Sequence, residues 1–298
     1  MAASGSRSAT ERGAGSELQA PRGEALAQRA AREDAPLSAP TVTAAVLARD
    51  EEAFLDACLR SLAWADEVLV VVDAASRDRT EAIARARGAR VARRAFDSFP
   101  GQRNAALALA RGDWVLFVDA DERVSPALAA EVRAAIGGAG AGYWIPRRNR
   151  ILGHWMRGAG WHPDEQLRLL RREAARYDPA RLVHEVAEVD GALGRLQAPL
   201  VHLNYASLAE FWGKQRRYAT LAARSRAAQP PRARALLGMP LREFWRRFVR
   251  LGGYRDGALG LVLCVILAYF EWETVRQARA LARSAAAATP PAAGLEAS

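Results

Sequence analysis

Alternating strand and helix patterns between residues 41 and 119 restrict the chain to a small set of folds. Apolar runs of strand length alternate with segments whose apolar residues recur at helical spacing. The predicted strands are 41–48, 67–73, 89–94 and 113–119, and the predicted helices are 51–62, 78–88 and 100–112. Because the strand runs are continuous rather than alternating, they indicate an α/β fold with a mostly parallel sheet covered on both faces.

The pattern changes after residue 125. One more helix is predicted, then short strands in an aromatic, glycine-interrupted stretch, and then a helical region. The helix covers 126–138, and the strands are at 143–148, 166–170, 181–191 and 198–205. Both ends of the chain are low in complexity. We therefore expect disordered tails at 1–40 and 285–298, an α/β domain at 41–205, and a helical, basic region at 206–284.

Acidic side chains follow three of the predicted strands. The residues concerned are Arg49-Asp50-Glu51 after the first strand, Asp73 at the end of the second, and Asp119, Asp121 and Glu122 after the fourth. The carboxyl ends of parallel strands meet at one edge, where such sheets bind ligands. Carboxylates this close repel one another, so a positive charge has to lie among them. Glu122 is expected to point elsewhere and is assigned no role.

Neither common phosphate-binding loop is present. The first predicted strand is followed by Ala-Arg-Asp-Glu rather than by Gly-x-Gly-x-x-Gly, and the one lysine of the chain, Lys214, comes too late for a P-loop. A hard divalent cation takes carboxylate and phosphate oxygens together. We therefore expect Asp119 and Asp121 to share Mg²⁺ or Mn²⁺ with a bound diphosphate, and this cation to offset their repulsion.

Seven short motifs occur together along the chain. They are ARDEE (48–52), SRDRT (76–80), GQRN (101–104), GDWVLFVDADERV (112–124), AGWHPDEQLRLLRR (159–172), VHE (183–185) and YRDGALGLVL (254–263). In this order they resemble the family 2 glycosyltransferases of GT-A fold, in particular the bacterial subgroup typified by lipopolysaccharide-core β-1,4-glucosyltransferases. The resemblance covers residues 41–275, and 41–136 resembles the Rossmann-like half that binds the nucleotide sugar.

The resemblance implies an inverting, metal-dependent transfer of a sugar, expected to be glucose or another hexose. A UDP-sugar is the expected donor, and a lipid-linked or cell-envelope glycan is the expected acceptor. The donor-binding residues implied are Arg49, Asp50, Glu51, Asp73, Arg103, Asn104, Asp119, Gln166 and Arg168. The loop at 74–77, Ala-Ala-Ser-Arg, departs from the Ser/Gly-rich loop of the family, which leaves the identity of the donor open.

Roles follow from the same resemblance. Asp73 is expected to accept a hydrogen bond from the uracil imide, and Arg103 and Asn104 to lie beside the base and ribose. Asp119 is expected to approach the ribose and the metal. The implied metal ligands are Asp121, Asp119 and His184, the last of which stands next to Glu185.

Asp164 is the candidate general base that takes the proton of the acceptor hydroxyl, with its neighbour Glu165 as the alternative. Gln166 and Arg168 are expected near the diphosphate and the acceptor. The other histidines, His154, His162 and His202, stand in no motif.

Each of these residues also has an ordinary structural explanation. The aspartates are common turn and helix-cap residues, and an arginine such as Arg103 is often simply solvated. Tryptophans at 144, 155 and 161 suit stacking against an acceptor sugar, although partly buried packing is the more usual role of this residue type.

Positive charge is concentrated near the C-terminus. Residues 214–255 contain twelve Lys or Arg residues and one acid, a net charge of +11, so that the rest of the chain sums to −1. A helix over 239–253 would place Leu241, Phe244, Trp245, Phe248, Val249 and Leu251 on one face and Arg242, Arg246, Arg247 and Arg250 on the other. Such a helix suits an anionic membrane surface, and the alternative is a core-packed helix with a solvated face.

An unbroken apolar run covers 258–270. As a helix it would span about 20 Å, short of the hydrocarbon core of about 30 Å. Glu271 and Glu273 are expected to end it, which favours interfacial attachment or burial over a transmembrane span. No Sec-type signal is visible, and Cys58 and Cys264 suggest buried thiols in a reducing compartment. The predicted location is cytoplasmic, peripheral on the inner membrane.

Two other classes of function compete with this one. A catalytically inactive nucleotide-sugar-binding module would share the acidic edge but would keep Asp164 and His184 away from it. A nucleic-acid binder would account for the arginines, but the chain has no recognised DNA- or RNA-binding motif. That class also leaves the acidic edge unexplained, so no nucleic-acid partner is expected.

Overall fold

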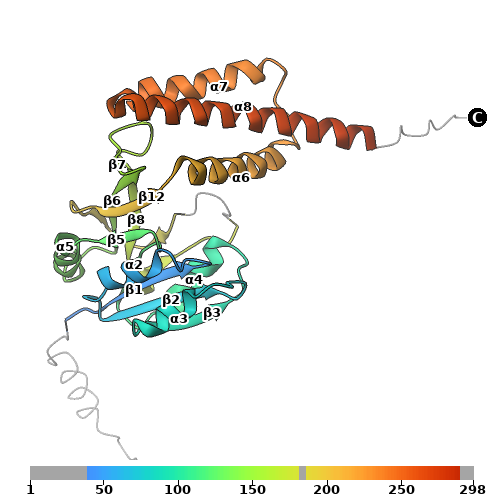
Figure 1. The fold of residues 1–298 in the computed structure, drawn as a ribbon. Coiled ribbons are helices and arrows are strands. Elements are labelled where there is room, and N and C mark those ends of the chain that lie inside the picture. The colour runs from blue at the N-terminus through green and yellow to red at the C-terminus, as the bar shows by residue number, and fades with distance from the viewer. Residues whose placement is uncertain (1–38, 181–185, 289–298) are drawn as a thin grey trace, which may run out of the picture. The chain divides into compact units, whose positions relative to one another are not determined.

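The computed structural model describes residues 39–180 and 186–288, and the described residues from Pro40 onward form one compact unit (Figure 1). An α/β domain is followed by a helical region. The principal strands of the α/β domain are β1 (Val42–Ala48), β2 (Glu67–Asp73), β3 (Arg90–Arg94), β4 (Trp114–Phe117), β5 (Glu122–Val124), β6 (Gly142–Ile151), β8 (Glu165–Arg171) and β12 (Leu200–Tyr205). Short strands are β7 (His154–Trp155), β9 (Ala175–Arg176), β10 (Glu188–Val189) and β11 (Leu193–Arg195). Its helices are α2 (Leu55–Ser61), α3 (Thr80–Ala86), α4 (Phe99–Leu109) and α5 (Pro126–Ile136).

The main sheet runs in the order β3-β2-β1-β4-β8-β6-β12-β5. The first four strands are mutually parallel, as their apolar sequences predict, and β8 pairs antiparallel with both β4 and β6. The expected α/β fold is therefore confirmed. Because β2 and β4 lie on opposite sides of β1, the loops that follow β1 and β4 diverge, which is where open α/β sheets form a ligand crevice.

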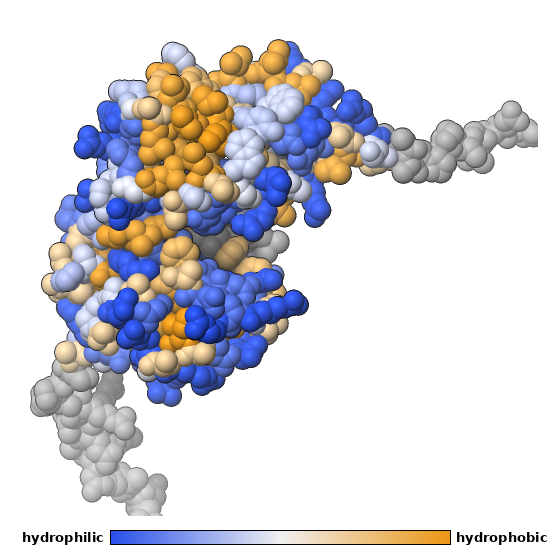
Figure 2. Space-filling model, in the orientation of Figure 1, coloured by the Kyte–Doolittle hydropathy of each residue, from blue (hydrophilic) through white to orange (hydrophobic). Residues whose placement is uncertain are grey.

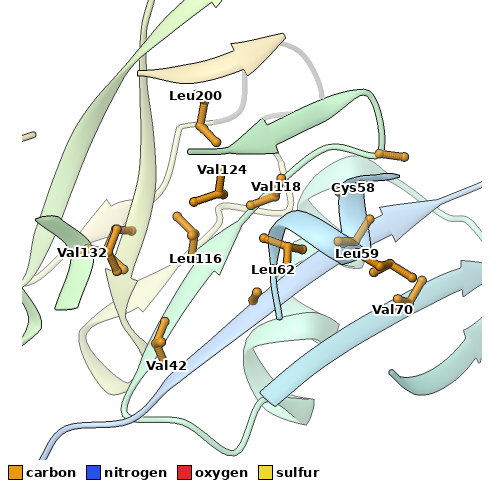
Figure 3. Close-up of a cluster of buried hydrophobic side chains, with 14 of the residues drawn as sticks. Val42, Cys58, Leu59, Leu62, Val70, Leu116, Val118, Val124, Val132 and Leu200 are labelled. Carbon is orange, nitrogen blue, oxygen red and sulfur yellow. The ribbon is translucent and has the colours of Figure 1, made fainter. Parts of the chain in front are cut away.

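Both faces of this sheet are covered. Residues of α2 and α5 pack with the face that carries Val42, Val70 and Leu116 (Figure 3). Residues of α4 pack with the opposite face, around Val115 and Phe117. Burial on both faces explains why β1, β2 and β4 lack polar alternation, and it fixes the positions of the loops at their carboxyl ends.

Several predicted elements are shorter than expected. The helix expected from residue 51 begins at Leu55, because the amides of Glu51 and Glu52 are instead held by Thr80 Oγ1 and Asp78 Oδ2, at 2.8 and 2.9 Å. The strand expected over 113–119 ends at Phe117, where the chain turns. Of the strand expected over 181–191, residues 181–185 lie outside the described part of the chain, and β10 covers two of the others.

The helical region contains α6 (Leu208–Arg226), α7 (Ala235–Trp245) and α8 (Gly257–Ala288), with a π-helical turn at Arg246–Arg250 and a 3₁₀ turn at Gly253–Asp256. It is seated on the domain by a small apolar cluster, in which Phe211 of α6 and Leu263 of α8 meet Ile151 of β6. Cys58 and Cys264 are both buried and free, as expected.

The expected end of the apolar helix at Glu271 and Glu273 is wrong. Helix α8 is 32 residues long and runs past both acids to Ala288, into the predicted tail. Glu271 is accommodated by an ion pair with Arg226 of α6, at 2.7 Å, and Glu273 by one with Arg276, at 2.6 Å. The stretch Gly253–Ala285 is long and apolar enough to cross a membrane by length and composition, and 39% of its most apolar window is buried within the protein.

Candidate active site

Two adjoining cavities lie at the carboxyl ends of the parallel strands. The first, of about 650 Å³ and here called the donor cavity, is lined by residues that include Glu51, Asp119, Asp121, Gln166, Arg168 and His202. The second, of about 380 Å³ and here called the base cavity, is lined by residues that include Arg49, Asp73, Phe96 and Gln102. Leu47, Glu51 and Phe99 line both cavities, so the two are neighbours. Sequence-predicted residues from three strand ends therefore converge, as the parallel sheet requires.

The acidic turn, defined as residues 119–122, is neutralised by arginines. Arg168 of β8 donates to both carboxylate oxygens of Asp119, at 3.0 and 2.5 Å, and Arg103 lies 4.0 Å from one of them. Burial acts to raise the pKa of Asp119, but Arg168, Arg103 and Arg147 outweigh it and hold that pKa well below its usual range. Asp119 is therefore ionised and already paired.

Glu122 is the buried centre of this turn. Its side chain has no exposed surface, accepts a hydrogen bond from the Asp119 amide at 2.9 Å, and lies 3.4 and 3.5 Å from Arg147 and Arg168. Burial raises the pKa of Glu122, and the charge of Asp119 adds to that effect. The expectation that Glu122 has no role is wrong, because it locks the turn. Arginines therefore supply positive charge that the sequence analysis expected from a metal.

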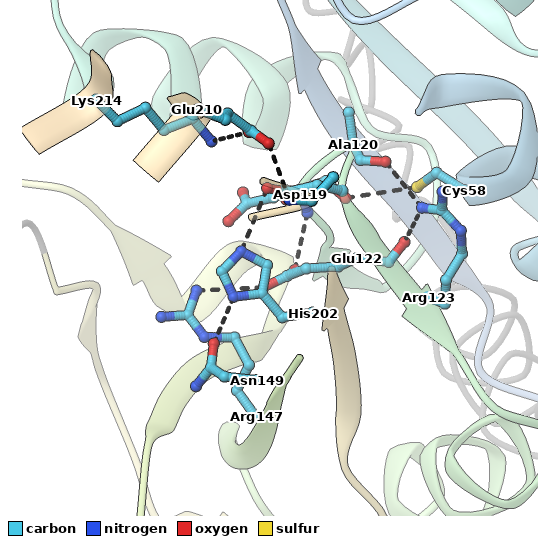
Figure 4. A network of polar contacts seen from close by, with 12 residues as sticks. Cys58, Asp119, Ala120, Glu122, Arg123, Arg147, Asn149, His202, Glu210 and Lys214 are labelled. Carbon is cyan, nitrogen blue, oxygen red and sulfur yellow. Dashed lines mark hydrogen bonds and ion pairs between the residues drawn. The ribbon is translucent and has the colours of Figure 1, made fainter. Parts of the chain in front are cut away.

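Asp121 leads into a chain of polar contacts that ends at Asp164. His202 Nε2 lies 3.3 Å from Asp121 Oδ2, and His202 Nδ1 lies 2.6 Å from Asn149 Oδ1 (Figure 4). The Asn149 amide nitrogen donates to Asp164 Oδ2 and to the Trp161 carbonyl, at 2.9 and 2.8 Å. The candidate metal ligand Asp121 and the candidate general base Asp164 are thus joined through His202 and Asn149.

This chain of contacts fixes which ring nitrogen of His202 donates to Asn149. Both partners of the Asn149 amide nitrogen are acceptors, so Asn149 Oδ1 must face the ring, and Nδ1 must carry the proton. In the neutral ring Nε2 then presents a lone pair toward the carboxylate of Asp121. Two acceptors at 3.3 Å call for a proton or a cation between them.

Asp164 accepts three hydrogen bonds. The donors are Arg147 Nε at 2.7 Å, Asn149 Nδ2 at 2.9 Å and Gln166 Nε2 at 2.7 Å. Burial acts to raise the pKa of Asp164, but these donors outweigh it and lower the pKa below its usual value. The candidate base is therefore in the deprotonated form that a base requires. The alternative, Glu165, pairs instead with Arg195 at 2.8 Å.

The base cavity contains two buried acceptors that lack hydrogen bonds within the described chain. They are Asp73 Oδ2 and Gln102 Oε1. Asp73 Oδ1 is occupied by the Ala75 amide at 2.9 Å, and Arg49 Nη1 lies 3.3 Å from Oδ2. Buried acceptors without donors are costly, so this cavity suits a ligand that brings N–H groups.

Two predicted donor-binding residues do not line either cavity. Asp50, with a φ of 54°, accepts from the Arg77 amide at 2.8 Å and so ties two loops together. Asn104 exchanges two hydrogen bonds with the backbone of Tyr177, at 2.8 and 2.9 Å, which hold its side chain against that residue. Arg103 stays close to the site, with its guanidinium 5.1 Å from the Phe117 ring centre. His184 and Glu185 lie outside the described residues.

Sequence reasoning missed His202 and Gln102 as site residues. His202 stands in no sequence motif, and only the pairing of β12 with β5 and β6 brings it to Asp121. Gln102 stands inside the GQRN motif, which was the signal available in the sequence. In the structure it is buried on the inner side of α4. Trp144 lines the donor cavity, whereas Trp161 packs against Phe211.

Glu51 titrates near neutrality. Burial and the charge of Asp121 raise the pKa of Glu51 from 4.5 to about 7, against the opposing effect of Lys214. A carboxyl group whose pKa is raised by folding holds its proton more tightly in the folded state. The stability of the folded state should therefore fall as the pH rises from 4.5 toward about 7.

Glu51→Gln should remove this loss. In metal-free buffer, the melting temperature of Glu51→Gln relative to wild type should increase between about pH 5 and about pH 8. Glu52→Gln, at the exposed neighbouring position, serves as the control and should show a flat difference. A flat difference for Glu51→Gln as well would show that Glu51 is not buried among like charges.

Known proteins match this chain over its α/β domain. The family model for glycosyl transferase family 2 matches residues 43–187. Residues 43–187 form a glycosyltransferase family 2 domain. The lipopolysaccharide core biosynthesis glycosyltransferase LpsC of Rhizobium meliloti (strain 1021) is 28% identical over 231 residues, which are 74% of this chain and 85% of that protein. The chain is thus a glycosyltransferase.

Other relatives match over less of their length or with a weaker likeness. An uncharacterized glycosyltransferase of Rickettsia bellii (strain RML369-C) is 31% identical over 91 residues, which are 30% of this chain and 31% of that protein. The crystal structure of TarS 1–349 from S. aureus aligns with a TM-score of 0.41 and 17% identity, over 84% of this chain and 92% of that one.

Proposed function

We propose that this glycosyltransferase moves a hexose, with inversion, from a nucleotide diphosphate donor to a lipid-linked or cell-envelope glycan, and that it needs Mg²⁺ or Mn²⁺. The observation that carries the proposal is the adjacency of the base cavity and the donor cavity, which share Glu51. A nucleotide sugar has the same order of parts, with its base at one end and its diphosphate and sugar beyond.

The nucleobase is assigned to the base cavity. Asp73 Oδ2 and Gln102 Oε1 lack hydrogen-bond donors and would accept from the N–H groups of a base. Phe96 and Phe99 meet edge to face at 5.1 Å on the same cavity wall, where they offer aromatic surface to a planar ring. A uracil base supplies the imide N–H for Asp73, which supports a UDP-sugar as donor.

The side chains suit a metal that is held jointly with the diphosphate. Within the described residues no group of three or more His, Cys, Asp or Glu side chains could hold a metal ion alone. Magnesium-type sites commonly use one or two carboxylates together with substrate phosphates and water. Asp121 Oδ2 and His202 Nε2, which lie 3.3 Å apart, would supply such a partial site, and a bound cation would offset charge on the departing diphosphate.

Asp121 and His202 are the principal metal ligands in this proposal. Arg168 already donates to both oxygens of Asp119, at 3.0 and 2.5 Å, so a metal at Asp119 would share those oxygens with the guanidinium. Asp119 also holds Arg168 at the wall of the donor cavity. These two partners lie 49 residues apart in sequence.

Asp164 would take the proton of the attacking hydroxyl. Its carboxylate is ionised and is held in place by Arg147, Asn149 and Gln166. Because Asn149 also holds His202, the same amide orients the base and the metal-side histidine. Positioning of this kind contributes to catalysis by limiting the geometries that the acceptor and donor can sample.

An activity panel tests the proposed function. Purified protein is incubated with UDP-, GDP-, CMP- and dTDP-sugars, with Mn²⁺ or EDTA, and with or without membrane lipid extract, and nucleotide release is measured. We expect release from a UDP-hexose that requires Mn²⁺ and is stimulated by the extract. Release that ignores the metal, or no release from any donor, would contradict the proposal.

We also propose that the helical region binds an anionic membrane surface. Leu237, Leu241 and Trp245 form a stripe along α7 and are 73%, 68% and 59% exposed. Hydrophobic residues gather over this region in Figure 2. The predicted arginine face is only partly available, because Arg246 and Arg247 pair with Glu243, whereas Arg242 and Arg250 form no ion pair with any described residue. Exposed aromatic and aliphatic residues beside arginine favour interfacial binding.

Leu241→Ser/Trp245→Ser should weaken binding to vesicles of anionic phospholipid by about tenfold or more, because each side chain contributes apolar area to the interface. Vesicle flotation measures the effect. Leu109→Ser/Leu193→Ser, which changes two exposed leucines of the α/β domain, should bind as wild type does. Equal flotation of all three proteins would contradict the assignment of this surface.

A further inference from the structure

A third cavity, of about 770 Å³, adjoins the donor cavity at Glu165, which lines both. It is here called the arginine pocket. Its walls come from β6, β7, the loop before β8, the segment before β12, and the 3₁₀ turn that precedes α8. The polar and aromatic residues that the argument uses are Arg148, Trp155, Arg157, Asp164, Glu165 and Arg255.

The arginine pocket carries positive charge that the protein does not neutralise. Arg148, Arg157 and Arg255 line it, and the side chains of all three form neither an ion pair nor a hydrogen bond with any described residue. The two acids of the pocket are already engaged, Asp164 by Arg147 and Glu165 by Arg195. Three uncompensated guanidinium groups around one concavity favour a negatively charged ligand.

Two contacts fix parts of this pocket. The guanidinium of Arg148 lies 4.4 Å from the ring centre of Trp155, and the backbone amide of Arg157 donates to Asp256 at 2.8 Å. Trp155 is only partly buried, so its ring adds an aromatic surface beside the arginines. A second guanidinium, that of Arg150, lies 5.6 Å from the same ring centre, so Trp155 holds arginine side chains at the wall of the pocket.

The pocket lies on the acceptor side of the site. The base cavity and donor cavity meet at Glu51, whereas the arginine pocket meets the donor cavity at the other end, beside Asp164 and Glu165. A hydroxyl group that gives its proton to Asp164 belongs to the acceptor, so the remainder of the acceptor can extend into the arginine pocket. The donor diphosphate is already accounted for in the donor cavity.

We propose that the arginine pocket is an acceptor subsite that selects a glycan residue bearing an anionic group, either a phosphate or a sugar carboxylate. The proposal rests on the proposed function, which makes Asp164 the group that meets the acceptor. It adds the chemical class of the acceptor, which neither the fold nor the family determines.

Ligand-observed NMR with soluble probes tests this subsite. Dissociation constants are measured for glucose 6-phosphate, glucuronate and neutral glucose, each with and without saturating UDP and Mn²⁺. We expect at least one anionic probe to bind about tenfold or more tightly than glucose, and UDP to leave that binding unchanged. Tighter binding of glucose 6-phosphate than of glucuronate would identify the anionic group as a phosphate, and the reverse order would identify it as a carboxylate.

Variants locate the binding. Arg148→Gln/Arg157→Gln/Arg255→Gln should weaken the preferred anionic probe by about tenfold. The matched control is Arg232→Gln/Arg234→Gln/Arg242→Gln, which removes the same charge from a different pocket and should change binding by less than about twofold. The single variants Arg148→Gln and Arg157→Gln, both at exposed positions, provide the same test with less risk to folding.

Three results would overturn the proposal. They are glucose binding as tightly as both anionic probes, displacement of the anionic probe by UDP, or equal losses in the two triple variants. UDP binding is measured in the same samples. If the wild-type protein does not bind UDP, the proposed donor site is refuted. If it binds UDP but neither anionic probe, only the acceptor subsite is refuted.

Discussion

Asp121→Ala should lower kcat/KM for sugar transfer by about 100-fold or more, because it removes the carboxylate that would hold the metal against the leaving diphosphate. Asp121 is the acid of the acidic turn whose carboxylate forms no ion pair with an arginine among the described residues, and its described side-chain contact is with His202 at 3.3 Å. Loss of Asp121 leaves His202 as the remaining metal-side group, which is too little for a divalent cation.

Asp113→Asn is the matched control for this change. Asp113 precedes β4, whereas Asp121 follows it, so both variants alter an aspartate at an end of the same strand. Asp113 binds Thr41 and lies outside the cavities, so its variant should keep wild-type turnover within about twofold. Comparable turnover in Asp121→Ala and wild type would contradict the metal assignment.

Asp164→Asn should reduce transfer by about 10³-fold and leave UDP binding within about twofold of wild type, because a general base acts only in the chemical step. The structure places Asp164 in the arginine pocket and outside the donor cavity, which is why donor binding should survive. Steady-state kinetics and UDP titration on the same sample separate the two effects.

Glu165→Gln is the control for this assignment. Glu165 lines both the arginine pocket and the donor cavity, but it pairs with Arg195. The rate of sugar transfer by Glu165→Gln should therefore fall by less than about tenfold. A larger loss in Glu165→Gln than in Asp164→Asn would reverse their roles. Melting temperatures of both variants are needed, since Asp164 accepts three hydrogen bonds.

The fold was predictable because its signal is local. The strands β1, β2 and β4 are continuous apolar runs, and the acids at their ends identified the edge at which the two cavities lie. Parallel pairing then brings Asp73, Asp119 and Asp121 to one side without further information. The motif residue Asp164 lies in the arginine pocket, which adjoins the donor cavity at Glu165.

The charge partners were not predictable because they come from distant parts of the chain. Glu122 looks like an exposed turn residue in sequence, yet pairing of β5 with β12 buries it beside Arg147 and Arg168. The end of the apolar helix was misjudged for a similar reason. Glu271 continues α8 because Arg226, 45 residues earlier, neutralises it.

The most direct measurement is a calorimetric titration of UDP into wild-type protein, first with Mn²⁺ and then with EDTA. A diphosphate held by Asp121 and His202 through a cation predicts saturable binding with Mn²⁺ that weakens by about tenfold or more on chelation. In Asp121→Ala the two titrations should coincide at the weaker affinity. Equal UDP affinity with and without Mn²⁺ in the wild-type protein would contradict a metal-bridged donor site.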